Sequence, residues 1–288
     1  MRDESIDVIY AMNSRGIANA AFAAIGTSVK MVNYRGTVSG VYRYDPTAYL
    51  THLHPRVDGI ICQANAVRDY LRQQVWRKIK IETVYKGQDV SWFTGEKADM
   101  REFGIAPDDF VVTCAANVRP SKGVDVLLAA TKRMADLDRL HVLIAGRGTD
   151  SEQFRALVAD SPLKDRVRLL GPREDIVSLM AASNLYVQPS ISGEGLSKAV
   201  PEAMGNAVPA VVTTTGGVKE LIEEGKTGFV VPVRDPDAMA ERIRYCYLHP
   251  EETKNMGQAA KIRLGEHFTI EHSVDGHIRF FADLLAGT

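Results

Sequence analysis

The sequence predicts an α/β protein with two Rossmann-like domains, each built on a parallel sheet. Short β-branched runs alternate with longer helical patterns along the 288 residues, which is typical of βαβ units. The alternation stops between Lys86 and Asp109, where glycine, aspartate, proline and charged residues indicate a linker followed by a short helix. The chain therefore divides into a smaller first part and a larger second part.

The first part contains four predicted strands, which make only a partial sheet. They are Ile6–Tyr10, Val29–Asn33, Gly59–Cys62 and Ile81–Val84. Helical patterns separate them at Ser14–Ala24, Thr47–His52 and Ala64–Gln74. Asn13 or Ser14 can cap the first helix, because a short polar side chain accepts a hydrogen bond from a free helix N–H.

The second part contains six predicted strands and forms a complete doubly wound domain. The strands are Val111–Ala115, His141–Ala145, Val167–Leu170, Leu185–Gln188, Ala210–Thr213 and Gly228–Val231. The helices are Val124–Met134, Ser151–Asp160, Ile176–Ala181, Leu196–Met204, Val218–Glu223, Asp237–Leu248, Glu251–Glu266 and Glu271–Leu285. We assign residues 1–97 and 98–270 to the two domains, and expect the helix in 271–288 to pack back toward the first.

Composition excludes several classes of protein. The formal net charge of −1 leaves no basic footprint for nucleic acid. Cys62, Cys114 and Cys246 are odd in number and far apart, so we expect buried thiols in a reducing cytosol rather than disulfides. No stretch approaches the roughly 18 apolar residues of a membrane span, and the first residues lack a signal-peptide pattern.

A metal site is not expected either. The sequence has no histidine cluster with metal-ligand spacing. His52 and His54 flank Leu53, and we interpret both as surface or domain-interface residues.

The turn after Leu185–Gln188 is the most informative one, because ligands of open α/β sheets bind beyond the carboxyl ends of strands. Glu194 lies there between two glycines, which allow close approach of a ligand. The helix expected next offers free N–H groups at Gly195, Leu196 and Ser197 for a phosphate or sugar hydroxyl. Glu202, about two helical turns beyond Glu194, can grip the other end of an extended ligand.

Two further turns offer complementary groups. Asn117, Arg119 and Lys122 follow the strand Val111–Ala115, and a lysine just before a helix is suited to a diphosphate. Gly216 and Gly217 follow the strand Ala210–Thr213 and allow a backbone to approach phosphate or sugar closely. Surface charge and a tight turn are the alternative interpretations, and three such turns in one sheet favour a ligand site.

The stretch from Asn117 to Asp235, which contains these three turns, resembles the second domain of family 4 retaining glycosyltransferases of the GT-B architecture. The matching stretches include SKGVDVLLAA, HVLIAGRG and GEGLSKAVPEAMGNAVPAVVTTTGGVKELIEEGKTGFVVP. The resemblance implies that Glu202 binds the donor ribose, Glu194 contacts the transferred sugar and Lys122 holds the diphosphate. It also implies a nucleotide diphosphate sugar as donor, with UDP favoured, and no cofactor.

The sequence also departs from this family. The arginine common five residues before the lysine is Asn117, so that Arg119 is the expected substitute, while Leu196 and Ser197 replace a common aromatic residue and glycine. Arg35 stands where members often carry a histidine near the reaction centre, and is expected to contact acceptor or donor phosphate. Roughly 60–80 residues of a normal acceptor domain have no counterpart before Ile6.

The resemblance therefore implies a retaining, metal-independent hexosyltransferase that acts on a surface-glycan or lipopolysaccharide-type acceptor, glycan or lipid-linked. A nucleotide-sugar-binding protein, or a fragment without transfer activity, is the alternative. A dehydrogenase is disfavoured because Ser151 stands where GxGxxG needs its last glycine, and no GxSxG frame supports a hydrolase. Peripheral membrane contact is a further hypothesis, resting on a basic and aromatic set: Arg68, Tyr70, Arg72, Trp76, Arg77, Lys78 and Lys80.

Overall fold

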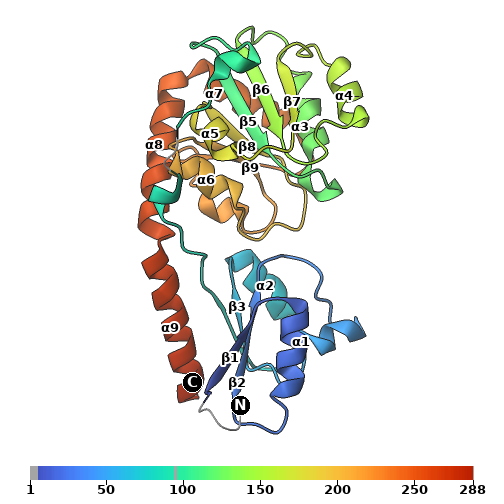
Figure 1. The fold of residues 1–288 in the computed structure, drawn as a ribbon, viewed down its shortest axis with the longest axis vertical. Helices are drawn as coiled ribbons and strands as arrows, with labels where there is room; N and C mark the ends of the chain where they lie inside the picture. The colour runs from blue at the N-terminus through green and yellow to red at the C-terminus, as the bar shows by residue number, and fades with distance from the viewer. Residues whose placement is uncertain (1–5, 94–95, 288) are drawn as a thin grey trace. The chain divides into compact units, whose positions relative to one another are not determined.

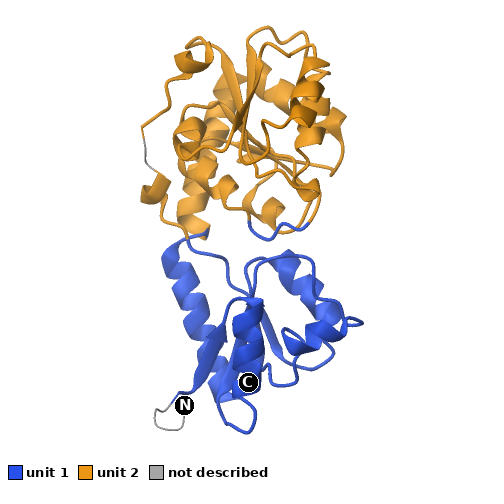
Figure 2. Ribbon diagram, turned by 45° about the vertical axis from the view of Figure 1, so that its right-hand side comes forward, with its two compact units in different colours: residues 1–87, 193–196, 268–288 blue, residues 88–192, 197–267 orange. Residues whose placement is uncertain are grey.

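The computed structural model describes residues 6–93 and 96–287 (Figure 1). The chain forms two compact units (Figure 2). The first comprises residues 1–87, 193–196 and 268–288, and the second comprises 88–192 and 197–267. Within the described ranges, no helix is both long enough and apolar enough to cross a membrane.

The first unit is built on a parallel four-stranded sheet in the order β1-β2-β3-β4. The strands are β1 (Val8–Ala11), β2 (Lys30–Arg35), β3 (Gly59–Cys62) and β4 (Lys80–Thr83). Its helices are α1 (Ser14–Ala23), α2 (Asn65–Gln74) and α9 (Ile270–Ala286), with a 3₁₀ turn, η1, at Pro46–Leu50. Asn13 caps α1 by accepting a hydrogen bond from Gly16 N, as predicted.

Both faces of this sheet are buried. Successive strand residues point to opposite sides of the sheet, so chain neighbours lie in different cores. Met31 and Ile60 lie in the core that contains residues of α1 and α2. Their chain neighbours Val32 and Ile61 lie in a second core with Phe280 of α9. The last helix of the chain therefore supplies the apolar cover for one face of the first sheet.

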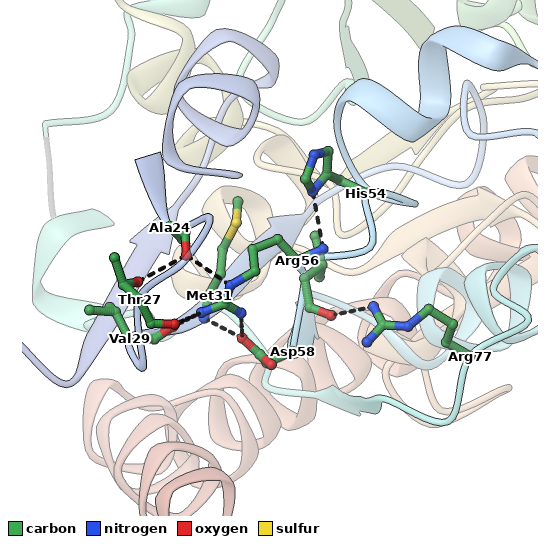
Figure 3. Close-up of polar contacts among 9 residues, drawn as sticks. Ala24, Thr27, Val29, Met31, His54, Arg56, Asp58 and Arg77 are labelled. Carbon is green, nitrogen blue, oxygen red and sulfur yellow. Dashed lines mark hydrogen bonds and ion pairs between the residues drawn. The ribbon is translucent and has the colours of Figure 1, made fainter. Parts of the chain in front are cut away.

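A hydrogen-bonded arginine fixes the connection between α1 and β2 (Figure 3). The Arg56 guanidinium donates to three carbonyl oxygens of this connection: Ala24, Thr27 and Val29. Arg56 also pairs with Asp58 at 2.7 Å, and Asp58 accepts from the backbone N–H of Met31 at 2.8 Å. Because charge-assisted hydrogen bonds are stronger than neutral ones, this network holds the turn before the second strand.

The second unit has a parallel six-stranded sheet in the order β10-β9-β8-β5-β6-β7. The strands are β5 (Phe110–Ala115), β6 (Leu140–Ala145), β7 (Val167–Gly171), β8 (Leu185–Gln188), β9 (Ala210–Thr213) and β10 (Gly228–Val231). This is the Rossmann order, and the direction of winding reverses between β5 and β8. The carboxyl ends of these two strands mark the expected ligand crevice.

Helices cover both faces of the second sheet. The α-helices are α3 (Val124–Thr131), α4 (Glu152–Ala159), α5 (Ile176–Ala181), α6 (Ala199–Gly205), α7 (Pro236–Leu248) and α8 (Pro250–His267). The 3₁₀ turns are η2 (Val90–Phe93), η3 (Met100–Phe103), η4 (Pro120–Lys122) and η5 (Val218–Leu221). One core joins Val112 and Ile144 to Leu127 of α3, and the opposite core joins Val111 to Leu179 of α5. Strands buried on both faces read as continuous apolar runs, which explains why the sequence revealed them.

The predicted α/β class with parallel sheets is confirmed, and three predicted helices are wrong in form. The expected helix Thr47–His52 is the 3₁₀ turn Pro46–Leu50, where Asp45 caps the Thr47 N–H. The expected helix Val218–Glu223 is the 3₁₀ turn η5. The helix predicted from Leu196 begins only at Ala199, so Gly195, Leu196 and Ser197 precede it and Glu194 is not on a continuous helix with Glu202. Local 3.6-residue periodicity did not detect these short turns.

For two histidines the surface alternative is wrong, because His52 and His54 are only 4% and 9% exposed. Burial lowers the pKa of His52 to about 4, and the positive charge of Arg35 acts in the same direction. His54 accepts a hydrogen bond from the Arg56 N–H at 3.1 Å (Figure 3). The sequence of this segment contains many polar residues, and it therefore did not reveal that the two histidine side chains are buried.

The expected burial of the three cysteines is confirmed. Cys62, Cys114 and Cys246 are buried free thiols in β3, β5 and α7. Burial raises the pKa of these thiols to about 12, 12 and 11, respectively, so each stays protonated and inert at neutral pH.

Candidate functional site

The loops after β5 and β8 meet where the winding of the second sheet reverses. The backbone N–H of Ile191 donates to the Ser121 carbonyl oxygen at 2.8 Å. Gly123 has φ +64°, and a Cβ there would lie 2.0 Å from the Pro189 carbonyl oxygen. Only glycine fits this left-handed position against the neighbouring backbone, and so Gly123 sets the geometry of the crevice.

Lys122 is positioned by the tight turn that precedes this glycine. Its backbone N–H donates to the Arg119 carbonyl oxygen at 2.9 Å, which closes η4. Helix α3 begins at Val124, directly after Gly123, as the sequence predicted. Lys122 therefore stands beside a helix N-terminus, where its charge adds to the positive end of the helix dipole.

Asn117 lines a hollow of about 330 Å³ at the carboxyl ends of β5, β6 and β7. Its side-chain oxygen accepts a hydrogen bond from the Arg147 N–H at 2.9 Å, and the Val118 N–H donates to the Arg147 carbonyl oxygen. Arg119 does not line this hollow but a different one. The structure therefore separates two residues that the sequence grouped as donor contacts.

Glu194 and Glu202 are both 8% exposed. Glu194 belongs to the segment 193–196 that groups with the first unit, whereas Glu202 lies in α6 of the second. The Lys198 ammonium lies 3.4 Å from the Glu202 carboxylate, and the Glu202 carbonyl oxygen accepts from Asn206. Two buried carboxylates need polar partners, because burying an unpaired charge is costly.

Ser197 joins the β8 loop to the start of α6. Its hydroxyl donates to the Gln188 side chain at 2.6 Å and accepts from the Val200 N–H at 3.4 Å. Ser197 is therefore fixed by the protein itself, and the serine that replaces a common glycine has a structural partner.

The predicted pair Gly216 and Gly217 follows β9, next to the β8 loop. The Thr213 hydroxyl at the end of β9 donates to the Ser190 carbonyl oxygen, which ties the two loops together. Gly216 has φ +55°, and Gly217 precedes η5. The turns after β5, β8 and β9 thus form one edge of the second sheet.

Arg35 lies at the end of β2 in the first unit. Its guanidinium donates to the Thr37 carbonyl oxygen at 3.2 Å and to that of Ser39. Burial lowers its pKa. Arg35 therefore shapes the loop that follows β2, in addition to any contact with a ligand.

Arg173 was not among the residues predicted for the site, yet it lines the hollow around Asn117 together with Arg147. Arg173 pairs with Asp175 at 2.6 Å, and its guanidinium lies over the Phe103 ring at 5.6 Å. The signal was available, because Arg147 and Arg173 closely follow β6 and β7. The rule that ligands bind beyond strand ends applies to them equally.

Two other expectations concern metals and membranes. Among the residues that the structure describes, no three or more His, Cys, Asp or Glu side chains are grouped as for a metal ion. In the basic and aromatic set, Arg72 and Arg77 donate to carbonyl oxygens of the first unit, and Lys80 pairs with Asp283 at 2.7 Å. Trp76 is 74% exposed.

Solved structures share this fold. A glycosyltransferase from Rickettsia africae superimposes with a TM-score of 0.85 at 18% identity, covering 100% of this chain and 79% of the other. Anabaena Alr3699/HepE in complex with UDP gives a TM-score of 0.82 at 22% identity, over 96% of this chain and 79% of the other. These similarities support the GT-B fold class.

The chain is also similar in sequence to known proteins. N-acetyl-alpha-D-glucosaminyl L-malate synthase from Bacillus anthracis is 28% identical over 98% of this chain and 76% of its own length. D-inositol 3-phosphate glycosyltransferase from Corynebacterium efficiens is 29% identical over 63% of this chain, and the match spans 46% of that relative. The model of the family described as glycosyl transferases group 1 matches residues 95–263, more than half of the chain. The chain therefore belongs to the glycosyl transferases group 1 family.

Proposed function

We propose that this protein is a retaining, metal-independent hexosyltransferase that uses a UDP-sugar. The observation that carries the proposal is the edge where the loops after β5, β8 and β9 meet, with Lys122 just before α3 and Glu202 in the first turn of α6. A sheet of this order binds nucleotides at that point. The UDP complex of the structural neighbour from Anabaena supports the choice of nucleotide.

In this proposal each group has one task. Glu202 accepts hydrogen bonds from the ribose hydroxyls, and its burial makes the carboxylate a strong acceptor. The hollow lined by Asn117, Arg147 and Arg173 receives the base. Lys122 holds the diphosphate, and Gly216 and Gly217 leave room for it. Glu194, with the backbone of Gly195, Leu196 and Ser197, contacts the transferred sugar.

The transfer step breaks the bond between the sugar anomeric carbon and the β-phosphate oxygen. The acceptor hydroxyl oxygen forms a new bond to that carbon on the same face, and its proton passes to the departing diphosphate. Negative charge therefore develops on the diphosphate, where the Lys122 ammonium stabilises it electrostatically. Arg35 is the group we assign to the acceptor or to the donor phosphate.

A thermal-shift panel of UDP, GDP and ADP with their sugars tests the donor site. UDP compounds are expected to give the largest shift, and Glu202→Ala to abolish it. Loss of a charge-assisted hydrogen bond to a buried site corresponds to at least about tenfold weaker binding. Glu241→Ala, which removes an exposed carboxylate from α7, is the matched control. An undiminished UDP shift in Glu202→Ala would rule out the ribose role.

The second candidate function is nucleotide-sugar binding without transfer. It needs only the groups assigned to the nucleotide, of which Asn117, Lys122 and Glu202 lie in the second unit. Incubation with labelled UDP-sugar and glycan or lipid-linked acceptors separates the two functions. Saturable binding without a labelled product would replace the transferase proposal by this one.

Peripheral membrane contact through the exposed Trp76 and its basic neighbours is a further part of the proposal. Co-sedimentation with anionic liposomes is expected to fall when the five cations are neutralised. If it does not change, the basic and aromatic set has no membrane role.

A further inference from the structure

A second hollow of about 690 Å³ lies within the second unit, and none of its lining residues is one of those assigned above to the donor. It is bordered by the loop after β5, the first turns of α3 and α4, the β8 loop and the loop between β10 and α7. It shares no lining residue with the hollow around Asn117. Its volume is in the range of about 300–1,000 Å³ that is usual for small-molecule sites.

Two arginines line this hollow, Arg119 and Arg234. Within the described part of the chain, neither guanidinium makes a hydrogen bond or an ion pair. Other arginines of the same unit are paired: Arg133 with Asp237, and Arg244 with Asp136. Two cations in one hollow repel each other unless an anion lies between them.

The backbone conformation at Arg234 also favours a ligand site in this hollow. Its φ of +58° is left-handed, a conformation that glycine or asparagine adopts far more readily than arginine. Local conformation alone would therefore select another residue at position 234. The arginine there is strained by its backbone conformation, and such strain is concentrated at functional positions.

The rest of the lining defines the ligand. Phe154 and Ile191 form an apolar wall, and Gln153 adds an amide at the edge. Asp125 is the acidic residue of the lining, so that the two guanidiniums leave the hollow net positive. Guanidinium groups bind phosphate oxygens in a fork geometry, and an apolar wall accommodates a ring or short chain.

We propose that this hollow binds a phosphate ester with an apolar or aromatic body, at a site separate from the donor site. Arg119 and Arg234 hold the phosphate, and Phe154 and Ile191 contact the body. The proposal does not depend on the transferase activity. It gives Arg119 a role that differs from the donor contact expected from the sequence.

Calorimetric titration of the full chain with phenyl phosphate and with inorganic phosphate tests the site. Phenyl phosphate is expected to bind more tightly because of the apolar wall. Arg119→Gln and Arg234→Asn are each expected to weaken it about tenfold or more. Asparagine suits the left-handed backbone, so the folded state of the second variant is preserved. Arg155→Gln, at an exposed position of α4, is the matched control.

Glu202→Ala distinguishes this site from the donor site, since phenyl phosphate binding is expected to be unchanged in that variant. Vesicles with phosphatidic acid identify the source of the phosphate. Vesicle binding that depends on both arginines would assign it to a lipid headgroup, and its absence to a soluble ester. The proposal is overturned if phenyl phosphate does not bind, or binds equally to Arg119→Gln, Arg234→Asn and the parent protein.

Discussion

At the scale of single residues, two polar side chains of the first unit are buried. Asn33 and His52 are polar, yet Asn33 is fully buried and His52 is 4% exposed. Both amide atoms of Asn33 and the Nε2 of His52 are without a hydrogen-bond partner among the described residues. Such groups cost folding free energy, because water would satisfy them in the unfolded chain.

The burial of His52 therefore predicts that the free energy of unfolding depends on pH. An unfolded histidine takes up a proton near pH 6.5, whereas the folded pKa of His52 is lowered to about 4 by burial. The unfolded state then binds more protons between these values, and the free energy of unfolding falls as the pH drops from 6.5 to 4. The contribution of His52 is fully present above about pH 6.5, and its loss amounts to at most about 3 kcal/mol.

Thermal unfolding at pH 7.5 and pH 5 checks this prediction. His52→Gln is expected to show a smaller decrease of Tm between the two values than the parent protein, since it removes the titrating group. An identical decrease in both proteins would mean that other groups cause the pH dependence. His54, whose pKa is also lowered by burial, is the first to examine in that case.

At the scale of elements, the candidate donor site is made by turns rather than by helices and strands. The β5 loop and the β8 loop touch through backbone atoms, at Gly123 and Pro189 and between Ser121 and Ile191. Their sequences are far apart, and their contact follows from strand order. The position of Lys122 depends on this contact.

A side chain at position 123 should disturb the crevice. In Gly123→Ala the left-handed backbone costs roughly 1–2 kcal/mol, and the new Cβ must also move away from the Pro189 carbonyl oxygen. We expect lower stability and a weaker UDP-induced thermal shift.

Gly104→Ala is the control for this variant. Gly104 has φ +70°, and a Cβ added there would meet no atom within 4 Å, so this variant reports the backbone cost alone. Urea unfolding and UDP titration of both variants give the comparison. If Gly123→Ala resembles Gly104→Ala in both measurements, close packing of the two loops does not shape the site.

At the scale of the whole molecule, the two ends of the described chain belong to one unit. Phe280 of α9 is fully buried in the core of the first unit with Val32, Ile61 and Val84. Gly59 lies beneath its ring, where a Cβ would come within 2.8 Å of Phe280. The first sheet therefore depends on the last helix.

Phe280→Ala should destabilise the first unit by about 3–5 kcal/mol, since it removes a fully buried aromatic ring. Hydrogen exchange is expected to show faster exchange in β1–β4 and unchanged protection in β5–β10. Ile278→Ala, at a 59% exposed position of the same helix, is the control with little effect. Equal loss of protection in both sheets would show that the units do not unfold separately.

The sequence was sufficient for the sheets. β3, β8, β9 and β10 begin and end where the pattern predicted, because buried parallel strands are continuous apolar runs bounded by turn residues. It also identified Lys122 before α3, since a lysine followed by an apolar helix is a local signal. Helix periodicity was less reliable in 196–204, where a serine with partners in β8 and α6 delays the helix to Ala199.

What the sequence determined by itself is the α/β class, the strands and the residue types at the strand ends, because these follow from local pattern and turn chemistry. Which of these residues share a hollow depends on how the loops pack in three dimensions. Asn117 and Arg119 are two positions apart in the sequence, yet they line different hollows. Arg119 and Arg234 are far apart in the sequence, yet they line the same hollow. Strand order and backbone conformation set such encounters, and neither is a property of a short stretch of sequence.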